Sequence, residues 1–315
     1  MAGDAPVLAL SGGVGGAKLA LGLYHVLPPD TLTVVANTGD DFEHFGLAIS
    51  PDLDTLLYTL SGASNPELGW GRRDETWSFM AALEKLGGET WFRLGDSDLA
   101  THVERTRRLA AGETLSAIME DFCRRVGIAA RLLPMSDDRV RTRLDTDRGW
   151  LDFQDYFVRL HCEPVVRRLD FAGAATAKPN ADILALLADP GLRAVIICPS
   201  NPFISIDPVL AVPGIREALR ACRAPVVAVS PIIGGKAVKG PTAKMMEELG
   251  LPVSAAAVAR HYRDFLAAYV ADEADRDAVA GLELPVVLAP TLMVTLEDRE
   301  ALARTVLDAA DRLRR

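Results

Sequence analysis

Residues 34–55, VVANTGDDFEHFGLAISPDLDT, carry the strongest fold signal in this 315-residue chain. The stretch begins inside the apolar run 31–36, which predicts a buried strand. It then passes through Asn37-Thr38-Gly39, residue types that favour tight turns. Polar side chains that follow a buried parallel strand lie at the edge where open α/β sheets bind ligands. We therefore expect a functional site directly after this strand.

Four aspartates follow the strand: Asp40, Asp41, Asp52 and Asp54. Asp52 and Asp54 are two positions apart, so in an extended segment they would share one face. Any one of these aspartates has an ordinary explanation as a turn residue or a helix cap. Four of them flanking the end of one strand favour a site.

A glycine-rich loop, Gly12-Gly13-Val14-Gly15-Gly16-Ala17-Lys18, separates an apolar strand over residues 7–10 from a helix that runs to about residue 26. Glycines let main-chain N–H groups approach a phosphate, whose charge a helix N-terminus favours. The loop departs from the dinucleotide fingerprint because Lys18 replaces the third glycine, and it lacks the GKS/GKT end of a Walker A loop. We interpret it as a generic phosphate loop, with a tight packing turn as the alternative.

The strand–loop–helix–strand order at the N-terminus predicts an α/β fold with a doubly wound, mainly parallel, Rossmann-like sheet. Buried strands are also expected over 192–198 and 225–229, followed by the polar loops Pro199-Ser200-Asn201 and Ser230 to Gly234-Gly235. Residues 242–249 and 255–269 are expected to be helical. These loops again lie at the ligand-binding edge of such a sheet.

Residues 99–171 are expected to form an α+β insertion in a nucleotide-binding core made of 1–98 and 172–315. Within this insertion, 140–144 and 150–153 alternate like a hairpin with a turn at 147–149. The helix expected over 99–109 carries Arg105, Arg107 and Arg108, which we interpret as a solvated face. His102 fits packing and function equally well. A helix is also expected over 52–61.

The composition excludes several classes of protein. The chain is 49% hydrophobic and carries a net charge of −9 without long charged runs, so nucleic-acid binding is not expected. Its four cysteines lack a CxxC pair, which argues against zinc and fits a reducing compartment. No signal-peptide pattern or long apolar stretch is present. We therefore expect a cytoplasmic protein that does not span a membrane.

Seven motifs together resemble the 2-phospho-L-lactate transferase family, which makes the deazaflavin coenzyme F420. They cover about residues 7–293 and are the glycine loop 12–18, Asn37-Thr38-Gly39-Asp40-Asp41, Pro51-Asp52-Leu53-Asp54-Thr55, Gly69-Trp70-Gly71, Trp91-Phe92-Arg93-Leu94-Gly95-Asp96, Pro199-Ser200-Asn201-Pro202, and Ser230-Pro231-Ile232-Ile233-Gly234-Gly235.

The resemblance implies a displacement at phosphorus, in which the deazaflavin alcohol Fo attacks a guanosine diphosphate-linked three-carbon acid and GMP leaves. It implies Mg²⁺, held by Asp40, Asp41, Asp52 and Asp54. Asp40, Asp41 and Asp54 are the expected catalytic residues, and Asp54, Trp91 and Arg93 are expected to contact Fo. The expected nucleotide-binding residues are Gly12, Gly13, Gly15, Gly16, Lys18, Ser200, Asn201, Gly234 and Gly235. A homodimer is expected.

Two other functions stay open from the sequence. A regulatory protein of the gluconeogenesis-factor type would bind nucleotide sugars with a similar glycine loop and fold, but segment 91–96 and the PDLDT run favour the transferase. A dinucleotide-dependent oxidoreductase is disfavoured by Lys18 and by the absence of an acidic residue directly ending the second strand. The sequence does not distinguish phospholactate, phosphoenolpyruvate and phosphoglycerate as the acid transferred.

Overall fold

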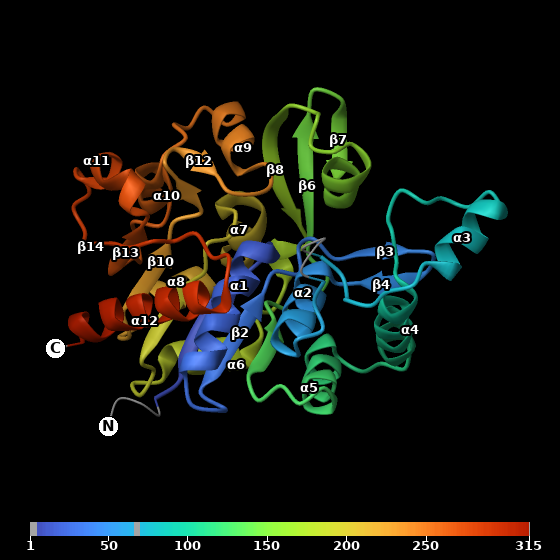
Figure 1. Ribbon diagram of the computed structural model, residues 1–315, viewed down its shortest axis with the longest axis horizontal. Helices are drawn as coiled ribbons and strands as arrows, with labels where there is room; N and C mark the ends of the chain where they lie inside the picture. Colours follow the sequence, from blue (N-terminus) through green and yellow to red (C-terminus); the bar gives the residue numbers. More distant parts are fainter. Residues whose placement is uncertain (1–4, 66–69, 315) are drawn as a thin grey trace.

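A parallel sheet of seven strands forms the centre of the protein, in the order β14-β13-β10-β9-β1-β2-β5 (Figure 1). The structure is a computed structural model that describes residues 5–65 and 70–314. The strands of the sheet are β1 (Val7–Ser11), β2 (Leu32–Ala36), β5 (Arg131–Pro134), β9 (Ala194–Ile197), β10 (Val226–Val229), β13 (Ala268–Ala271) and β14 (Val286–Leu288). The expected doubly wound α/β fold is confirmed.

The strand order reverses at β1, which pairs with β2 on one side and with β9 on the other. The chain winds outward from β1 through β2 to β5, and then returns to build β9, β10, β13 and β14 on the opposite side. The segments that follow β1 and β9 therefore pack on opposite faces of the sheet. Such a switch point is where open α/β sheets bind ligands.

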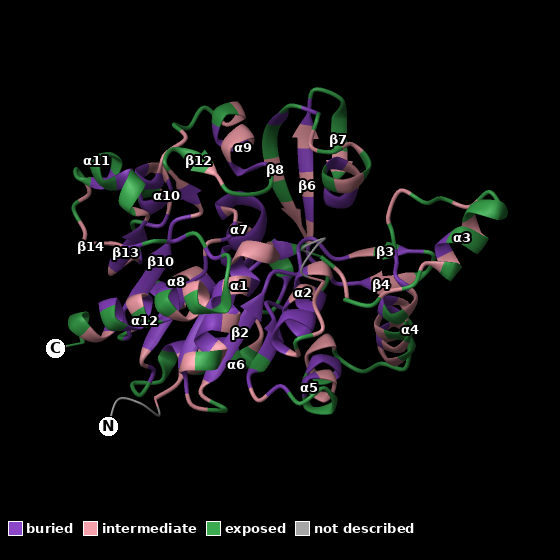
Figure 2. Ribbon diagram, in the orientation of Figure 1, coloured by how far each residue is buried: buried purple, intermediate pink, exposed green. Residues whose placement is uncertain are grey.

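Helices cover both faces of the sheet, so its inner strands are buried throughout (Figure 2). Alternation along β9 separates the two cores, because Val195 and Ile197 face one layer while Ala194 and Ile196 face the other. The layer that Ala194 and Ile196 face contains α1 (Gly13–Val26), α2 (Pro51–Leu60), α5 (Leu115–Arg125) and α12 (Leu296–Leu313). The layer that Val195 and Ile197 face contains α6 (Ala181–Ala188), α8 (Ile215–Ala221), α9 (Thr242–Glu248) and α10 (Ala255–His261).

A hairpin that the sequence analysis did not predict follows β2. It consists of β3 (Phe42–His44) and β4 (Leu47–Ile49), and turns at Phe45 and Gly46 with φ of 53° and 71°. Positive φ at both central residues suits the twist of a two-residue hairpin. The hairpin and the helices α3 (Ser78–Lys85) and α4 (Asp96–Ala110) extend to one side of the sheet, and we call residues 42–49 and 76–110 the side lobe (Figure 1).

A second, antiparallel sheet has the order β7-β6-β8, with β6 (Arg141–Thr146), β7 (Gly149–Asp152) and β8 (Val166–Ala172). Its β6–β7 pair confirms the predicted hairpin. The main-chain N–H of Thr142 donates to the carbonyl of Gly39 at 2.8 Å, which ties β6 to the turn after β2. The range 99–171 is not wholly separate from the central sheet, because β5 lies inside it and pairs with β2.

The expected helix over residues 255–269 is wrong in its second half. α10 ends at His261, and β13 begins at Ala268. All four residues of β13 are buried, so the strand lacks the polar–apolar alternation that separates a strand from a helix in a sequence. Alanines throughout this region favour a helix locally.

Short elements complete the chain: η1 (Asp155–Arg159), η2 (Ala174–Thr176), η3 (Pro202–Ile206), α7 (Asp207–Leu210), β11 (Ile232–Ile233), β12 (Lys236–Ala237), η4 (Glu273–Asp275) and α11 (Arg276–Val279). Over residues 5–65 and 70–314, no helix is both long enough and apolar enough to cross a bilayer.

Candidate active site

Three loops meet at the switch point of the sheet. The N–H of Gly12 donates to Ser200 Oγ at 3.1 Å, which joins the loop after β1 to the loop after β9. The N–H of Gly13 donates to Asp52 Oδ1 at 2.7 Å, which joins the start of α1 to the start of α2. The structure thus brings the glycine loop, Ser200 and Asp52 together, as expected from the sequence.

Asp52 is also fixed from the end of β2. Asn37 Nδ2 donates to Asp52 Oδ2 at 3.0 Å and to the carbonyl of Ile204 at 3.2 Å, while Asn37 Oδ1 accepts the N–H of Gly39 at 2.8 Å. Asn37 therefore closes the turn after β2 and holds the Asp52 carboxylate at the sheet edge.

The expectation that Asp52 and Asp54 share one face of an extended segment is wrong. Both lie in the first turn of α2, which begins at Pro51. Residues two apart in an α-helix point about 200° apart, so the two side chains leave opposite sides. Asp52 faces the glycine loop, whereas Asp54 faces α4 of the side lobe.

Asp40 and Asp41 are buried beside Asp52. Ser50 Oγ donates to Asp41 Oδ2 at 2.8 Å, but Oδ1 of Asp41 and Oδ1 of Asp40 are buried without a hydrogen-bond partner in the described structure. Burial raises the pKa of Asp41 to about 7 and that of Asp52 to about 6. Burial first, and then the nearby charge of Asp52, raises the pKa of Asp40 well above its ordinary value. This edge therefore concentrates carboxylates that a cation would stabilise.

Unsatisfied buried polar atoms gather at the same edge. Five of them are Thr38 Oγ1, Asp40 Oδ1, Asp41 Oδ1, Arg141 Nε and Thr142 Oγ1. A buried polar group without a partner is costly and needs an explanation. Because these five come from two adjoining segments, the turn after β2 and the start of β6, a ligand or ion at this edge is the simplest one. Sequence analysis missed Arg141 and Thr142, which bear no local functional pattern.

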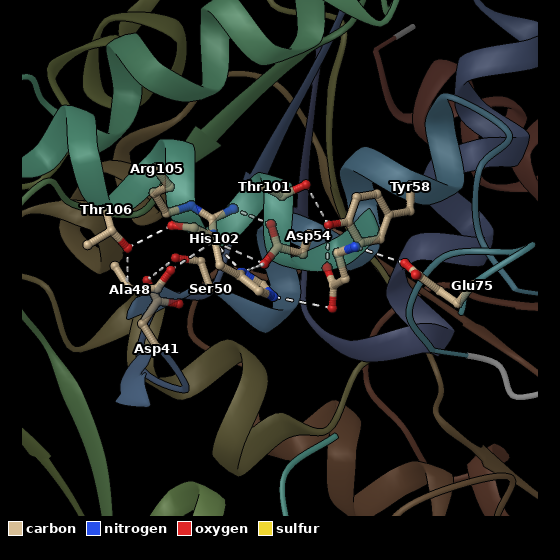
Figure 3. A network of polar contacts seen from close by, with 11 residues as sticks. Asp41, Ala48, Ser50, Asp54, Tyr58, Glu75, Thr101, His102, Arg105 and Thr106 are labelled. Carbon is tan, nitrogen blue, oxygen red and sulfur yellow. Dashed lines mark hydrogen bonds and ion pairs between the residues drawn. The ribbon is translucent and has the colours of Figure 1, made fainter. Parts of the chain in front are cut away.

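A buried ionic network joins α2 to α4 (Figure 3). Arg105 donates to both carboxylate oxygens of Asp54, with Nη1 to Oδ2 at 3.1 Å. His102 lies between two acids, with Nδ1 at 3.6 Å from Asp54 and Nε2 at 3.2 Å from Asp98. Tyr58 donates its hydroxyl to Asp98 at 2.5 Å.

The interpretation of Arg105 as part of a solvated face is wrong, because its side chain is fully buried. Arg107 on the same helix is exposed, as expected. α4 packs against β4, and Arg105 Nη1 also donates to the carbonyl of Ala48 at 3.3 Å. The signal that could have identified Arg105 is its pairing with acids of α2, which helix periodicity alone does not reveal.

Two of the expected Fo residues, Trp91 and Arg93, lie in the side lobe, whereas Asp54 lies in α2. The ring of Trp91 contacts Phe42 and Phe92, and the Arg159 guanidinium lies 4.4 Å from its centroid. Arg93 is exposed and lies 4.1 Å over the ring of Trp77. Gly69 of the expected Gly69-Trp70-Gly71 motif lies outside the described residues. The lobe thus presents aromatic rings and cations, which suit a flat polar ligand.

The glycines of the nucleotide loop have different reasons to be glycine. A Cβ on Gly15 would lie 2.6 Å from the carbonyl oxygen of Pro199, and one on Gly16 would lie 2.5 Å from Ser200 Oγ. These two positions let α1 pack closely against the loop after β9. Gly13 instead has φ of +65° and would project a Cβ into open space. Gly13 is therefore the position where a phosphate has room to approach.

Several other expected nucleotide residues contact protein groups. Lys18 Nζ donates to the carbonyl of Met293 at 2.8 Å, and burial lowers its pKa, with Arg299 and Lys239 adding to the effect. Asn201 Oδ1 accepts the N–H of Phe203 at 2.9 Å and so caps η3. The N–H groups of Gly234 and Gly235 donate to Asp275 at 2.9 and 3.0 Å. These residues shape the loops around the edge.

The carboxylate oxygens at this edge differ in how well they suit a magnesium ion. Mg²⁺ is commonly bound by one or two carboxylates together with phosphate oxygens and water. The unpartnered Oδ1 atoms of Asp40 and Asp41 fit that requirement. Asp54 fits less well, because Arg105 occupies its carboxylate. In the part of the chain that the structure describes, no group of three or more acidic, histidine or cysteine side chains is arranged to hold a metal by itself.

Fold and site together define an α/β protein that presents a phosphate loop and buried aspartates at the switch point of a parallel sheet. The chain belongs to the 2-phospho-L-lactate transferase CofD family, whose family model matches residues 7–291. It is thus a member of a transferase family of coenzyme F420 biosynthesis. This confirms the resemblance drawn from the sequence.

Similar proteins carry a more specific name. Phosphoenolpyruvate transferase of Kitasatospora aureofaciens is 44% identical over 318 residues, and the alignment covers 98% of this chain and 98% of that protein. Phosphoenolpyruvate transferase of Streptomyces coelicolor is 42% identical over 317 residues, covering 98% of this chain and 99% of that protein. The crystal structure of a UPF0052 family member from Bacillus halodurans matches with a TM-score of 0.64 and 13% identity, covering 96% of this chain and 99% of that one. That likeness shows the fold alone.

Proposed function

We propose that this protein transfers the phosphoenolpyruvate group from a guanosine diphosphate-linked donor to the ribityl hydroxyl of Fo. The hydroxyl oxygen forms a bond to the phosphorus that carries the acid, the bond from that phosphorus to the bridging oxygen breaks, and GMP leaves. The family supports the transferase chemistry, and the relatives named phosphoenolpyruvate transferase support the choice of acid. The observation that carries the proposal is the meeting of the glycine loop with the buried aspartates at one edge.

Phosphoryl transfer depends on positioning and charge neutralisation more than on covalent help from the protein. The start of α1 at Gly13 offers a helix N-terminus to the guanosine-bearing phosphate. Asp52 fixes this start through the Gly13 N–H. The side lobe, through Trp91 and Arg93, is the proposed contact for the deazaflavin ring.

Asp41 is the proposed acceptor of the hydroxyl proton. A carboxylate whose pKa is raised by burial is a better base than an ordinary surface aspartate, and the pKa of Asp41 is raised to about 7. General base catalysis of this kind typically contributes about 10²–10⁴-fold. Asp54 is hydrogen-bonded to Arg105, so we propose that it positions the side lobe and contacts Fo. We do not assign proton transfer to it.

Magnesium is proposed as the ion of this site, held by Asp40 with Asp52 beside it, which leaves Asp41 as the base. Bound there, it would neutralise charge on the phosphates. An acidic protein with a net charge of −9 needs such local neutralisation to hold a diphosphate donor beside buried aspartates. We also propose that the protein works as a homodimer in the cytoplasm, with light scattering as the test of its oligomeric state.

The experiment that tests the function is incubation of purified protein with Fo and each of three donors: guanylylated phosphoenolpyruvate, phospholactate and phosphoglycerate. Mass analysis is expected to show GMP and dehydro-F420-0 from the phosphoenolpyruvate donor, formed faster than GMP and the corresponding product from either other donor. EDTA is expected to abolish turnover and added Mg²⁺ to restore it. Preference for another acid would refute the choice of substrate, and full turnover in EDTA would remove the metal from the proposal.

The regulatory alternative predicts a different result in the same assay. A protein that only binds nucleotide sugars would give no product from any donor and no saturable Fo binding. Family and relatives favour the transferase over this alternative.

A further inference from the structure

Arg141 is a half-buried cation that forms no direct ion pair with a carboxylate of the described residues. Among the described residues, its only hydrogen-bond acceptors are two main-chain carbonyls, those of Val140 at 2.7 Å and Thr38 at 3.5 Å, both contacted by Nη1. Its Nε is buried without a partner. A guanidinium has five N–H donors in a planar fork that matches carboxylate and phosphate groups. Apart from the two bonds of Nη1, the guanidinium donors of Arg141 have no acceptor among the described residues.

The surroundings of Arg141 place it inside the candidate active site. The residue lies at the start of β6, next to Thr142, whose N–H is bonded to the turn after β2. Among the charged groups around it, Asp41 attracts its guanidinium, Arg139 repels it, and Asp152 attracts it less strongly than Asp41 does. Asp41 is thus its main protein neighbour of opposite charge, and its own Oδ1 is unpartnered as well.

The site groups link Gly13 to Arg141 through the aspartates. The N–H of Gly13 donates to Asp52, Asp52 and Asp41 are the charged neighbours of Asp40, and Asp41 is the main acidic neighbour of Arg141, whose strand is bonded to the turn after β2. If the guanosine-bearing phosphate lies at Gly13, the reacting phosphate lies over the aspartates. The end of the donor that carries the three-carbon acid then lies at Arg141.

Resting on the proposed function, we infer that Arg141 binds the carboxylate of the three-carbon acid in the donor, and so selects donors that carry an acid at this end. The carboxylate would take the free N–H groups of the guanidinium. Its negative charge would also balance the positive charge of Arg141, which forms no direct ion pair with a described carboxylate. Arg141 becomes a substrate-binding residue for the acid-bearing half of the donor, distinct from the groups that hold GMP.

The test compares Arg141→Gln with Arg143→Gln as a matched control. Arg143 lies two residues along β6 on the same side of the strand, is partly exposed and pairs with Asp152 at 3.3 Å. Isothermal titration calorimetry measures the affinity of wild type and both variants for the phosphoenolpyruvate-bearing donor and for GDP, which keeps both phosphates but has no acid. Fluorescence titration with Fo reports whether each variant keeps its fold and its acceptor site.

Arg141→Gln is expected to weaken donor binding by about 10- to 150-fold, the usual effect of losing a charged hydrogen bond. GDP and Fo affinities should stay at wild-type values, Arg143→Gln should leave all three unchanged, and Arg141→Lys should restore part of the donor affinity. Equal losses for donor and GDP would place Arg141 on a phosphate and overturn the carboxylate assignment.

Unchanged donor affinity in Arg141→Gln, with a shifted pH profile of kcat, would make Arg141 only a counterion of Asp41 and would also overturn the inference. The binding measurements need no turnover, so they decide the inference separately from the proposed function. A wild type that binds the donor and forms no product would refute the function while the Arg141 comparison still stands.

Discussion

Arg105 holds Asp54 through both terminal nitrogens of its guanidinium, across the contact between α4 and α2. The Arg105 side chain is fully buried and that of Asp54 nearly so. His102 and Asp98 extend the network to Tyr58, so buried polar groups join the side lobe to α2. Ion pairs of Arg108 with Asp121 and of Arg159 with Glu89 also join the lobe to neighbouring elements, but the Arg105–Asp54 pair is the buried one among these three.

We predict that Arg105→Gln lowers the free energy of unfolding by about 3–5 kcal/mol, because it leaves the Asp54 carboxylate buried without its partner. Asp54→Asn in the same background should restore part of the loss, since the uncompensated charge is then removed. Urea denaturation of the single and double variants measures both effects. Arg107→Gln, on the exposed side of the same helix, is the control and should leave the midpoint unchanged. Additive losses in the double variant would contradict the pairing.

We predict that Gly13→Ala weakens GMP binding by more than the backbone strain of the substitution alone would cause. The new Cβ would project into the space where a phosphate approaches, and φ of +65° costs a residue with a Cβ about 1–2 kcal/mol. Gly112→Ala, with φ of +88° and equally open surroundings in the turn after α4, carries comparable backbone strain away from the site. Calorimetric titration with GMP should separate the two variants. Equal GMP affinities would mean that the glycine loop is only a packing turn.

We predict that the metal-free protein becomes less stable as the pH rises from about 4 to 7. Burial raises the pKa of Asp41 to about 7 in the folded protein, while an unfolded aspartate has a pKa of about 3.9. Between these values the folded state binds more protons than the unfolded state, so the free energy of unfolding falls with rising pH.

Thermal unfolding in EDTA at pH 5 and pH 8 measures this effect. Asp41→Asn should unfold at a higher temperature than wild type at pH 8, because folded wild type must then bury an ionised Asp41 and the variant has no charge at this position. The difference should be much smaller at pH 5, where Asp41 is still protonated in the folded protein. Added Mg²⁺ should stabilise wild type more at pH 8, where the carboxylates are ionised. Asp308→Asn, on an exposed position of α12, is the control and should follow wild type. A wild-type profile that rises over this pH range would refute the assignment.

We predict that Arg93→Ala weakens Fo binding by about 10- to 150-fold, corresponding to a charged hydrogen bond of ~1.5–3 kcal/mol. Arg93 is exposed over Trp77 and so is available to a ligand in the side lobe. Donor affinity should change little, because the donor is proposed to lie at the sheet edge. Fluorescence titration with Fo gives the comparison, with Arg73→Ala as a control on an exposed cation of the neighbouring segment. Wild-type Fo affinity in Arg93→Ala would exclude this residue from the acceptor site.

Local patterns in the sequence were sufficient for much of the fold. The apolar runs of β1, β2, β9 and β10 and the polar loops after them predict a parallel sheet, because strands buried on both faces must be continuously apolar. The hairpin β6–β7 was predicted from its alternation and turn residues. The site was predicted at the end of β2 because four aspartates follow this buried strand, at the edge where open α/β sheets bind ligands.

Tertiary structure decided the rest, because those features depend on contacts between distant segments. Four buried residues of β13 resemble a continuation of α10 until their pairing with β10 and β14 is known. Arg105 shares its helix with the exposed Arg107 and is distinguished from it by Asp54, 51 positions away. Arg141 reaches the edge through the bond between Thr142 and Gly39. Propensity and periodicity describe a residue's own element, whereas the partner of a buried charge is set by how the elements pack.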